Sequence, residues 1–167
     1  MKGPQKSPTS GRIPDRRQSG SAPVDTRLRM LDRSQRHAVL ATVSDAQPYT
    51  SLVAFALLPD LSGALFATPR DTFKYRNILN NDHVALLIDN RSNRSTSYME
   101  AEAVTILGRA VSVRRGKRWQ DLAEVFMAKH PSLGEFLSSP RTALVVIEAS
   151  HYLHVGRFQT VSQWKAR

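Results

Sequence analysis

The stretch Leu65–Asp89 constrains the fold most, because its pattern changes from strand to helix and back. An apolar run at 63–68 ends at Pro69, which has no backbone N–H to donate to a sheet ladder. Asp71 and Thr72 are both good helix N-cap types, and a second apolar run follows at 83–88. Between them, apolar residues fall at helical spacing: Tyr75, Ile78 and Leu79. The pattern predicts strand, turn, short helix and strand.

Other apolar runs bounded by turn residues extend this pattern along the chain. The candidate strands are 37–43, 49–58, 63–68, 83–88, 98–113 and 142–158. The runs at 37–43 and 49–58 are apolar on both faces, which is typical of strands covered on two sides, by a barrel interior and by a dimer interface or a helix. Gly108 predicts a bulge or a close backbone approach. Regular strand spacing with tight turns predicts an antiparallel β-barrel.

Three helices are predicted outside the strands, at 26–35, 117–129 and 133–137. The second is the clearest, since apolar residues recur at i, i+3, i+4 and i+7 and Pro131 lies just past its end. The predicted fold class is therefore mainly β with peripheral helices (α+β). Residues 1–24, rich in Pro, Gly, Ser and Arg, predict a disordered basic tail, which leaves one domain at 25–167.

Composition narrows the classes of function. The chain has no cysteine, which excludes disulfides, thiolate metal sites and a thiol nucleophile. Its net charge is +10, of which five basic residues and one acidic residue give +4 in the tail. A basic balance favours anionic partners, but no nucleic-acid motif accompanies it, so nucleic acid is not a predicted partner. Without a membrane-spanning run or a secretory signal, the sequence predicts a cytoplasmic protein with no membrane partner.

The start of the helix after Pro69 is a candidate anion site. Thr72 supplies a hydroxyl and Lys74 an ammonium, beside backbone N–H groups that have no intrahelical partner. A helix N-terminus with these groups suits a phosphate. The alternative is that Lys74 and Arg76 are solvated helix charges, and the local pattern alone favours that alternative.

Several fragments in this region resemble the central motif of the pyridoxamine 5'-phosphate oxidase-like family. They are Phe66-Ala-Thr68, Thr72-Phe-Lys74, Asn77-Ile78 and Val84-Ala-Leu-Leu87, and the similarity extends through most of residues 26–164. These proteins are FMN-binding split β-barrels. The resemblance implies an antiparallel split β-barrel of the FMN-binding type. It also implies a homodimer with cofactor sites at the subunit interface and a small-molecule substrate.

In that family, the Thr that ends the strand and the Ser/Thr and Lys that open the helix contact the FMN phosphate and ribityl chain. The resemblance therefore implies FMN contacts for Thr68, Thr72 and Lys74, with Arg70 and Asn77 as neighbours.

Two further segments hold candidate cofactor contacts. Arg91 opens the polar loop 90–97, which either holds an anion such as the flavin phosphate of the same or a neighbouring subunit, or is simply an exposed loop. The segment 156–164 resembles the family's closing segment, which often lies near the flavin across the dimer interface. This implies contacts from Arg157 and Trp164, although packing explains Trp164 equally well.

Histidine and glutamate pairs suggest other chemistries. His151 and His154 suggest a metal or haem ligand, but their odd separation places them on opposite faces of a strand. No His/Asp/Glu cluster has metal-ligand spacing, so no metal site is predicted. Glu100 and Glu102 suggest acid–base chemistry, but such a pair on a strand is more typical of a solvated face.

The sequence has no nucleophilic triad, phosphate loop or dinucleotide motif, so a bound flavin would carry the chemistry and the catalytic residues remain unknown.

Residues 51–58 lack the cations of the true oxidases, and no Arg-rich segment follows Gln159, which argues against vitamin B6 phosphates as substrate. Residues 50–56 resemble the true oxidases less than they resemble another branch of the family, which includes haem-utilisation proteins and many uncharacterised flavin binders. We predict an FMN-dependent oxidoreductase. The alternatives are a haem-binding or haem-utilisation protein on the same fold, and a non-catalytic module that binds flavin or nucleic acid.

Overall fold

The computed structural model describes residues 24–91, 99–156 and 160–166. The strands in this part are β1 (His37–Ser44), β2 (Gln47–Leu57), β3 (Gly63–Pro69), β4 (His83–Asp89), β5 (Ala103–Ser112), β6 (Thr142–Gly156) and β7 (Thr160–Lys165). The helices are α1 (Val24–Ser34), α2 (Phe73–Asn80), α3 (Lys117–Lys129), the 3-10 helix η1 (Pro131–Leu133) and α4 (Gly134–Ser138). Apart from Val24, the predicted tail lies outside the described residues.

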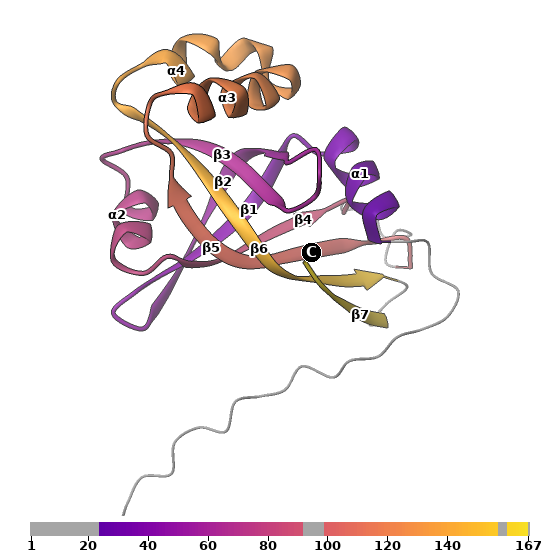
Figure 1. The fold of residues 1–167 in the computed structure, drawn as a ribbon. Coiled ribbons are helices and arrows are strands. Elements are labelled where there is room, and N and C mark those ends of the chain that lie inside the picture. Colours follow the sequence, from indigo (N-terminus) through magenta and orange to yellow (C-terminus); the bar gives the residue numbers. More distant parts are fainter. Residues whose placement is uncertain (1–23, 92–98, 157–159, 167) are drawn as a thin grey trace, which may run out of the picture.

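All seven strands belong to one antiparallel sheet in the order β3-β2-β1-β4-β5-β6-β7. An additional β3–β6 pairing closes the first six strands of this order into a barrel, and β7 extends the sheet beyond β6. The helices lie around the barrel, with α3 and α4 together at one end and α1 at another side (Figure 1). The predicted class, mainly β with peripheral helices, and the antiparallel barrel are confirmed.

The barrel is split between β2 and β3, because these two strands pair over only a short ladder. Their ladder runs only from the Phe55–Phe66 pair to the Leu57–Ala64 pair. Past Phe66, β3 continues along β6 as far as Pro69, whereas the first half of β2 continues along β1. Helix α2 follows β3 at this end, and the Asn77 amide fixes it to the barrel. These two strands therefore diverge beside α2.

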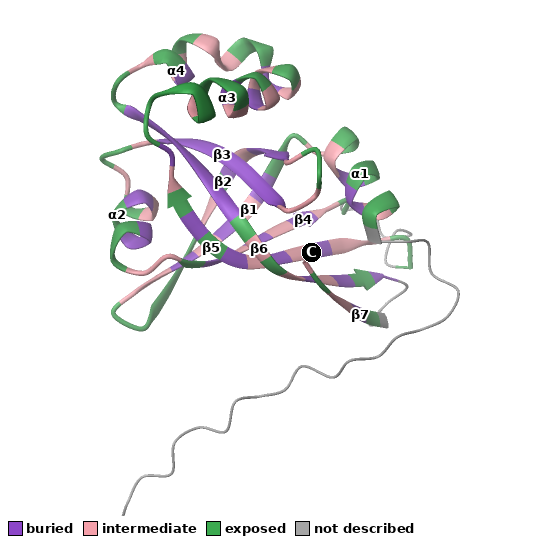
Figure 2. Cartoon of the chain, viewed as in Figure 1, coloured by how far each residue is buried: buried purple, intermediate pink, exposed green. Residues whose placement is uncertain are grey.

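Two clusters of buried apolar side chains hold the fold together. Figure 2 shows where the buried residues lie along the strands and helices. The first cluster fills the barrel interior and includes Phe55, Phe66 and Ile106, each fully buried. The second lies between the barrel and the α3–α4 pair and includes Leu65 and Phe126. Burying an apolar side chain of this size stabilises a fold by roughly 1.5–3 kcal/mol. The alternation of Leu65 and Phe66 between the two clusters explains why β3 is apolar on both faces.

Gly108 lies at a β-bulge, as predicted, because the β5–β6 register shifts between Leu107 and Gly108. A Cβ atom at this position would lie 2.2 Å from the Glu148 carbonyl oxygen, so the close backbone approach is also confirmed. His154 is buried and His151 is half-buried, with their side chains on opposite faces of β6, again as predicted.

Three expectations need correction. Leu79 is 63% exposed, and Asn77 faces the barrel instead, because its amide donates to Thr42 Oγ1 (3.0 Å). The strand expected at 98–113 begins only at Ala103, so Glu100 and Glu102 precede it. Glu102 is not on a solvated face, since its carboxylate forms ion pairs inside the structure.

Candidate functional site

The corner between β3 and α2 brings two of the predicted hydroxyls together. Thr68 is buried at the end of β3, and its Oγ1 lies 3.2 Å from Thr72 Oγ1. Thr72 is the N-cap of α2, because its Oγ1 accepts from the Tyr75 N–H (3.4 Å). The same oxygen donates to the Pro69 carbonyl (2.9 Å). The Thr68 hydroxyl also lies 3.5 Å from the Pro69 carbonyl oxygen, and either threonine hydroxyl could donate to the other.

Lys74 adds a cation to the first turn of α2, two residues after the N-cap Thr72. Its side chain is half-buried, and it forms no ion pair with any residue that the structure describes. The N–H groups of Phe73 and Lys74 occupy the first two helical positions, which have no intrahelical acceptor. The one carboxylate of the turn, that of Asp71, lies near Arg141 (3.8 Å) and is largely exposed. The corner therefore offers an ammonium, two N–H groups and two hydroxyls.

Arg70 and Asn77 belong to the same corner, but other residues hold their side chains. Arg70 Nη1 donates to Tyr75 Oη (2.7 Å), which lies 3.1 Å from Ser112 Oγ on β5. Asn77 is buried, and its amide is committed to Thr42. Arg70 remains exposed at the rim, whereas Asn77 positions α2 against β1.

A further hydroxyl, missed from the sequence, is that of Ser51. It stands directly opposite the core residue Leu40 on β1 and therefore faces the barrel interior, on the half of β2 that has parted from β3. Its Oγ is buried and has no hydrogen-bond partner among the described residues. A buried hydroxyl left unpaired is costly, so a bound polar group would stabilise it. The sequence signal was a small polar residue inside an otherwise apolar strand.

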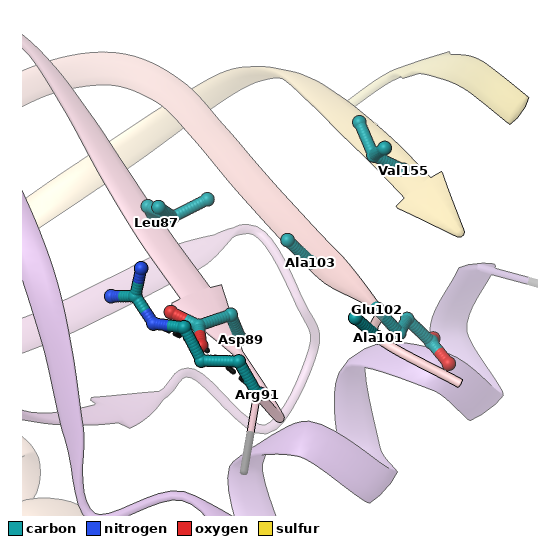
Figure 3. A pocket seen from close by; sticks show the side chains of 7 residues that line it. All are labelled: Leu87, Asp89, Arg91, Ala101, Glu102, Ala103 and Val155. Carbon is teal, nitrogen blue, oxygen red and sulfur yellow. Dashed lines mark hydrogen bonds and ion pairs between the residues drawn. The ribbon is translucent and has the colours of Figure 1, made fainter. Parts of the chain in front are cut away.

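Arg91 is not brought to this corner. It follows β4, whose other end adjoins α2, so the length of one strand, roughly 20 Å at 3.3 Å per residue, separates the two ends. Arg91 Nε pairs with Asp89 Oδ1 (3.0 Å). Arg91 also lines a hollow of about 200 Å³ on the outer face of the sheet. Figure 3 shows its side chain beside that of Asp89. The hollow is lined by Leu87, Asp89, Arg91, Ala101, Glu102, Ala103 and Val155.

Trp164 lies on β7, away from the β3–α2 corner. It is half-buried against the barrel core, and its ring centroid is 6.0 Å from that of His154. Arg157, its predicted companion, lies outside the described residues. Within one subunit the predicted set therefore divides. Thr68, Arg70, Thr72, Lys74 and Asn77 surround the start of α2, whereas Arg91 and Trp164 lie elsewhere on the barrel.

Near Trp164 lies a charged cluster that the sequence did not indicate. Glu102 Oε2 pairs with Arg27 Nη1 of α1 at 2.6 Å, and its Oε1 lies 3.1 Å from His154 Nε2. The His154 nitrogen is near the carboxylate but is not aligned for a hydrogen bond. Burial lowers the pKa of His154, while the charge of Glu102 acts in the opposite direction. The residues of this cluster lie too far apart in the sequence for a local pattern to reveal them.

The donors at the β3–α2 corner fit a phosphate and the hydroxyls of a sugar-like chain, which are the parts of FMN that the resemblance assigns to it. The orphaned Ser51 hydroxyl is consistent with a polar ligand in this region. Within the described ranges, no group of three His, Asp or Glu side chains could hold a metal ion.

The sequence pattern of pyridoxamine 5'-phosphate oxidase matches residues 25–161. The chain belongs to this family. A comparison with curated proteins gives no match. None of the described helices is long and apolar enough to cross a membrane. The cytoplasmic location stays a prediction.

Solved structures share the fold at low sequence identity. A haem-binding protein from Mycobacterium smegmatis has a TM-score of 0.71 at 15% identity, over 81% of this chain and 56% of its own. An FAD-binding protein from Mesorhizobium loti has a TM-score of 0.61 at 14% identity, over 83% and 90%. The haem storage protein HutZ from Vibrio cholerae has a TM-score of 0.60 at 15% identity, over 75% and 89%. This chain thus spans little more than half of the mycobacterial protein, and these solved structures, which share the fold, are described by different cofactors.

Proposed function

We propose that this protein binds FMN at the β3–α2 corner and acts as a flavin-dependent oxidoreductase on a small molecule. The observation that carries the proposal is the pair of hydroxyls on Thr68 and Thr72, 3.2 Å apart, at the start of a helix whose first turn also carries Lys74. Lys74 and the first N–H groups of α2 would hold the phosphate, and the hydroxyls of Thr68 and Ser51 would bond the ribityl chain. FMN would supply the redox chemistry, and the chain would bind and orient it.

A homodimer is part of this proposal and is supported by the outer face of the sheet. Leu52, Val39, Leu87, Thr105 and Leu153 stand directly opposite one another on successive strands, so they share one face. Leu52 is 67% exposed in the single chain. An exposed apolar sheet face of this kind marks an interaction site. A partner on this face would explain why the strands are apolar on both sides, and it would bring the partner's copies of Arg91 and Trp164 to a site they cannot reach within one chain.

The test is the visible absorption spectrum of the purified protein before and after FMN is added, with the released cofactor identified by mass. We expect a flavin spectrum with one FMN per subunit. A colourless protein that ignores FMN would overturn the flavin site. Bound FMN without turnover, across a screen of electron donors, would leave the alternative of a non-catalytic flavin module.

Haem is the second candidate, because two of the similar structures are described as haem proteins. In this chain, His154 Nε2 faces Glu102, so iron ligation by that atom would have to displace the 3.1 Å contact. The test is to add haem and record the Soret band. A sharp band that is lost when one histidine is replaced would favour this function over the flavin site.

A further inference from the structure

Two aromatic rings meet at the surface beside the candidate FMN site. Phe73 opens α2 and Tyr49 belongs to β2, and their ring centroids are 6.0 Å apart with a 33° angle between the planes. Phe73 is 63% exposed and Tyr49 is 40% exposed. Two exposed rings contributed by separate elements form a small apolar surface, which we call the aromatic platform (Tyr49, Phe73 and the adjoining Arg76).

Arg76 gives the platform a positive charge in a fixed position. Its guanidinium carbon lies 4.7 Å from the centre of the Phe73 ring, and its Nη1 donates to the Asp71 carbonyl oxygen (3.1 Å). That acceptor is neutral, so the charge of Arg76 is held but not cancelled. Between residues 70 and 80 there are three cations and one carboxylate, that of Asp71, which faces Arg141 instead. The electrostatic potential here favours an anion.

The platform and the candidate FMN site use the same helical turn but different faces. Successive helical residues are about 100° apart, so Phe73 and Lys74 point in different directions. Lys74 is half-buried, whereas Phe73 is largely exposed. A molecule on the platform can therefore bind while FMN occupies the corner.

We infer that the aromatic platform binds a second small molecule, a flat aromatic ring that carries an anionic group. The ring stacks on Phe73 and Tyr49, and the anionic group pairs with Arg76. This inference rests on the proposed function only in treating that molecule as the substrate or electron donor of the flavin reaction.

The test is equilibrium dialysis of 1-naphthyl phosphate against the full-length, FMN-saturated protein. Hexyl phosphate supplies the charge without the ring, and 1-naphthylmethanol supplies the ring without the charge. We expect 1-naphthyl phosphate to bind at least tenfold more tightly than either. Phe73→Ala should lower its affinity roughly tenfold, as expected for the loss of one stacking partner. Arg76→Gln should remove the preference for the charged compound.

Leu79→Ala is the matched control, because Leu79 is on the same helix and is exposed to the same extent, 63%. It should leave binding unchanged. The inference is wrong if the wild-type protein does not retain 1-naphthyl phosphate or if Phe73→Ala binds it equally well. It is also wrong if Phe73→Ala lowers the mass of the protein in solution, since the platform would then contact a second copy.

A failure of the flavin proposal gives a different result. FMN affinity is measured on each variant, and Phe73→Ala should retain it. If wild-type protein does not bind FMN, the dialysis is repeated without FMN in excess inorganic phosphate, which occupies the corner. The platform should still bind 1-naphthyl phosphate in that experiment, and loss of binding there would overturn it independently.

Discussion

Lys74 is the cation to which the proposal assigns the FMN phosphate, at the second position of α2 and two residues after the N-cap Thr72. We expect Lys74→Ala to weaken FMN binding by about tenfold or more, because a hydrogen bond to a charged group contributes about 1.5–3 kcal/mol. The fold should be retained, since Lys74 forms no described ion pair. Fluorescence titration of FMN measures the affinity. Lys117→Ala, at the exposed start of α3, is the control, and equal affinity in both variants would refute the phosphate assignment.

Ser51 allows a sharper test, because its two expected effects have opposite signs. In the FMN-free protein, Ser51→Ala removes a buried hydroxyl without a partner and should raise the free energy of unfolding by about 1 kcal/mol. The same change should weaken FMN binding if the hydroxyl bonds the cofactor. Denaturant unfolding with and without FMN measures both effects. A variant that loses stability in both states would show that Ser51 is already satisfied in the free protein.

The lowered pKa of His154 predicts that the folded protein loses stability in mild acid. Burial lowers its pKa in the folded protein below the ordinary 6.5, so below pH 6.5 the unfolded chain binds the proton more readily. Stability is therefore fully present above pH 6.5 and falls as the pH drops through the folded-state pKa. Burial also lowers the pKa of His130, which acts in the same direction.

His154→Gln should flatten the decline of the unfolding free energy between pH 6.5 and 5, compared with wild type. The charged groups that face His154 are Glu102 and Arg27, and both stay in place in this variant. Urea unfolding at a series of pH values is the measurement. An unchanged slope would mean that His154 does not contribute to the acid sensitivity, and His130→Gln would then be compared.

At the scale of whole elements, the β-bulge that β6 forms opposite Leu107 and Gly108 depends on the absence of a side chain at Gly108. Gly108→Ala would place a methyl group 2.2 Å from the Glu148 carbonyl oxygen, and a backbone atom of a paired strand has little freedom to move. We expect a loss of about 3 kcal/mol or more in unfolding free energy. Gly134→Ala is the control, because its nearest neighbour is the flexible end of Met127 at 3.3 Å and its backbone is helical. Similar thermal stability in both variants would contradict the close-approach argument.

Most elements were predictable because each depends on a local signal, whereas β7 was not among the expected strands. Pro69 and Thr72 mark the end of β3 and the start of α2, and apolar runs mark the strands. What the sequence could not indicate were bonds between distant residues. Asn77 is buried because it bonds Thr42, 35 positions away, and Glu102 is drawn inward by Arg27, 75 positions away. The same limit applies to the site, where Ser51 was recognisable only once the parting of β2 from β3 was known.

At the scale of the whole molecule, Leu52 is the residue whose substitution best tests the proposed homodimer. It is 67% exposed at the β2 end of the row on the outer sheet face, so Leu52→Asp should not disturb the core of a single chain. In the proposed dimer it would place a charge in an apolar interface, which is costly without a partner. We expect the mass in solution to fall from twice 18.7 kDa to 18.7 kDa.

Leu79→Asp, which introduces the same charge at a residue of similar exposure on α2, should leave the mass unchanged.

The variant Leu52→Asp should also lose FMN affinity, because Arg91 and Trp164 lie away from the β3–α2 corner in one chain and would reach the cofactor only from the partner. A Leu52→Asp monomer that binds FMN as tightly as wild type would show that the corner alone forms the site. If the wild-type protein is already monomeric, the proposed dimer is wrong. Arg91 and Trp164 then cannot contact the cofactor from a partner subunit. Light scattering combined with FMN titration on the same samples distinguishes these results.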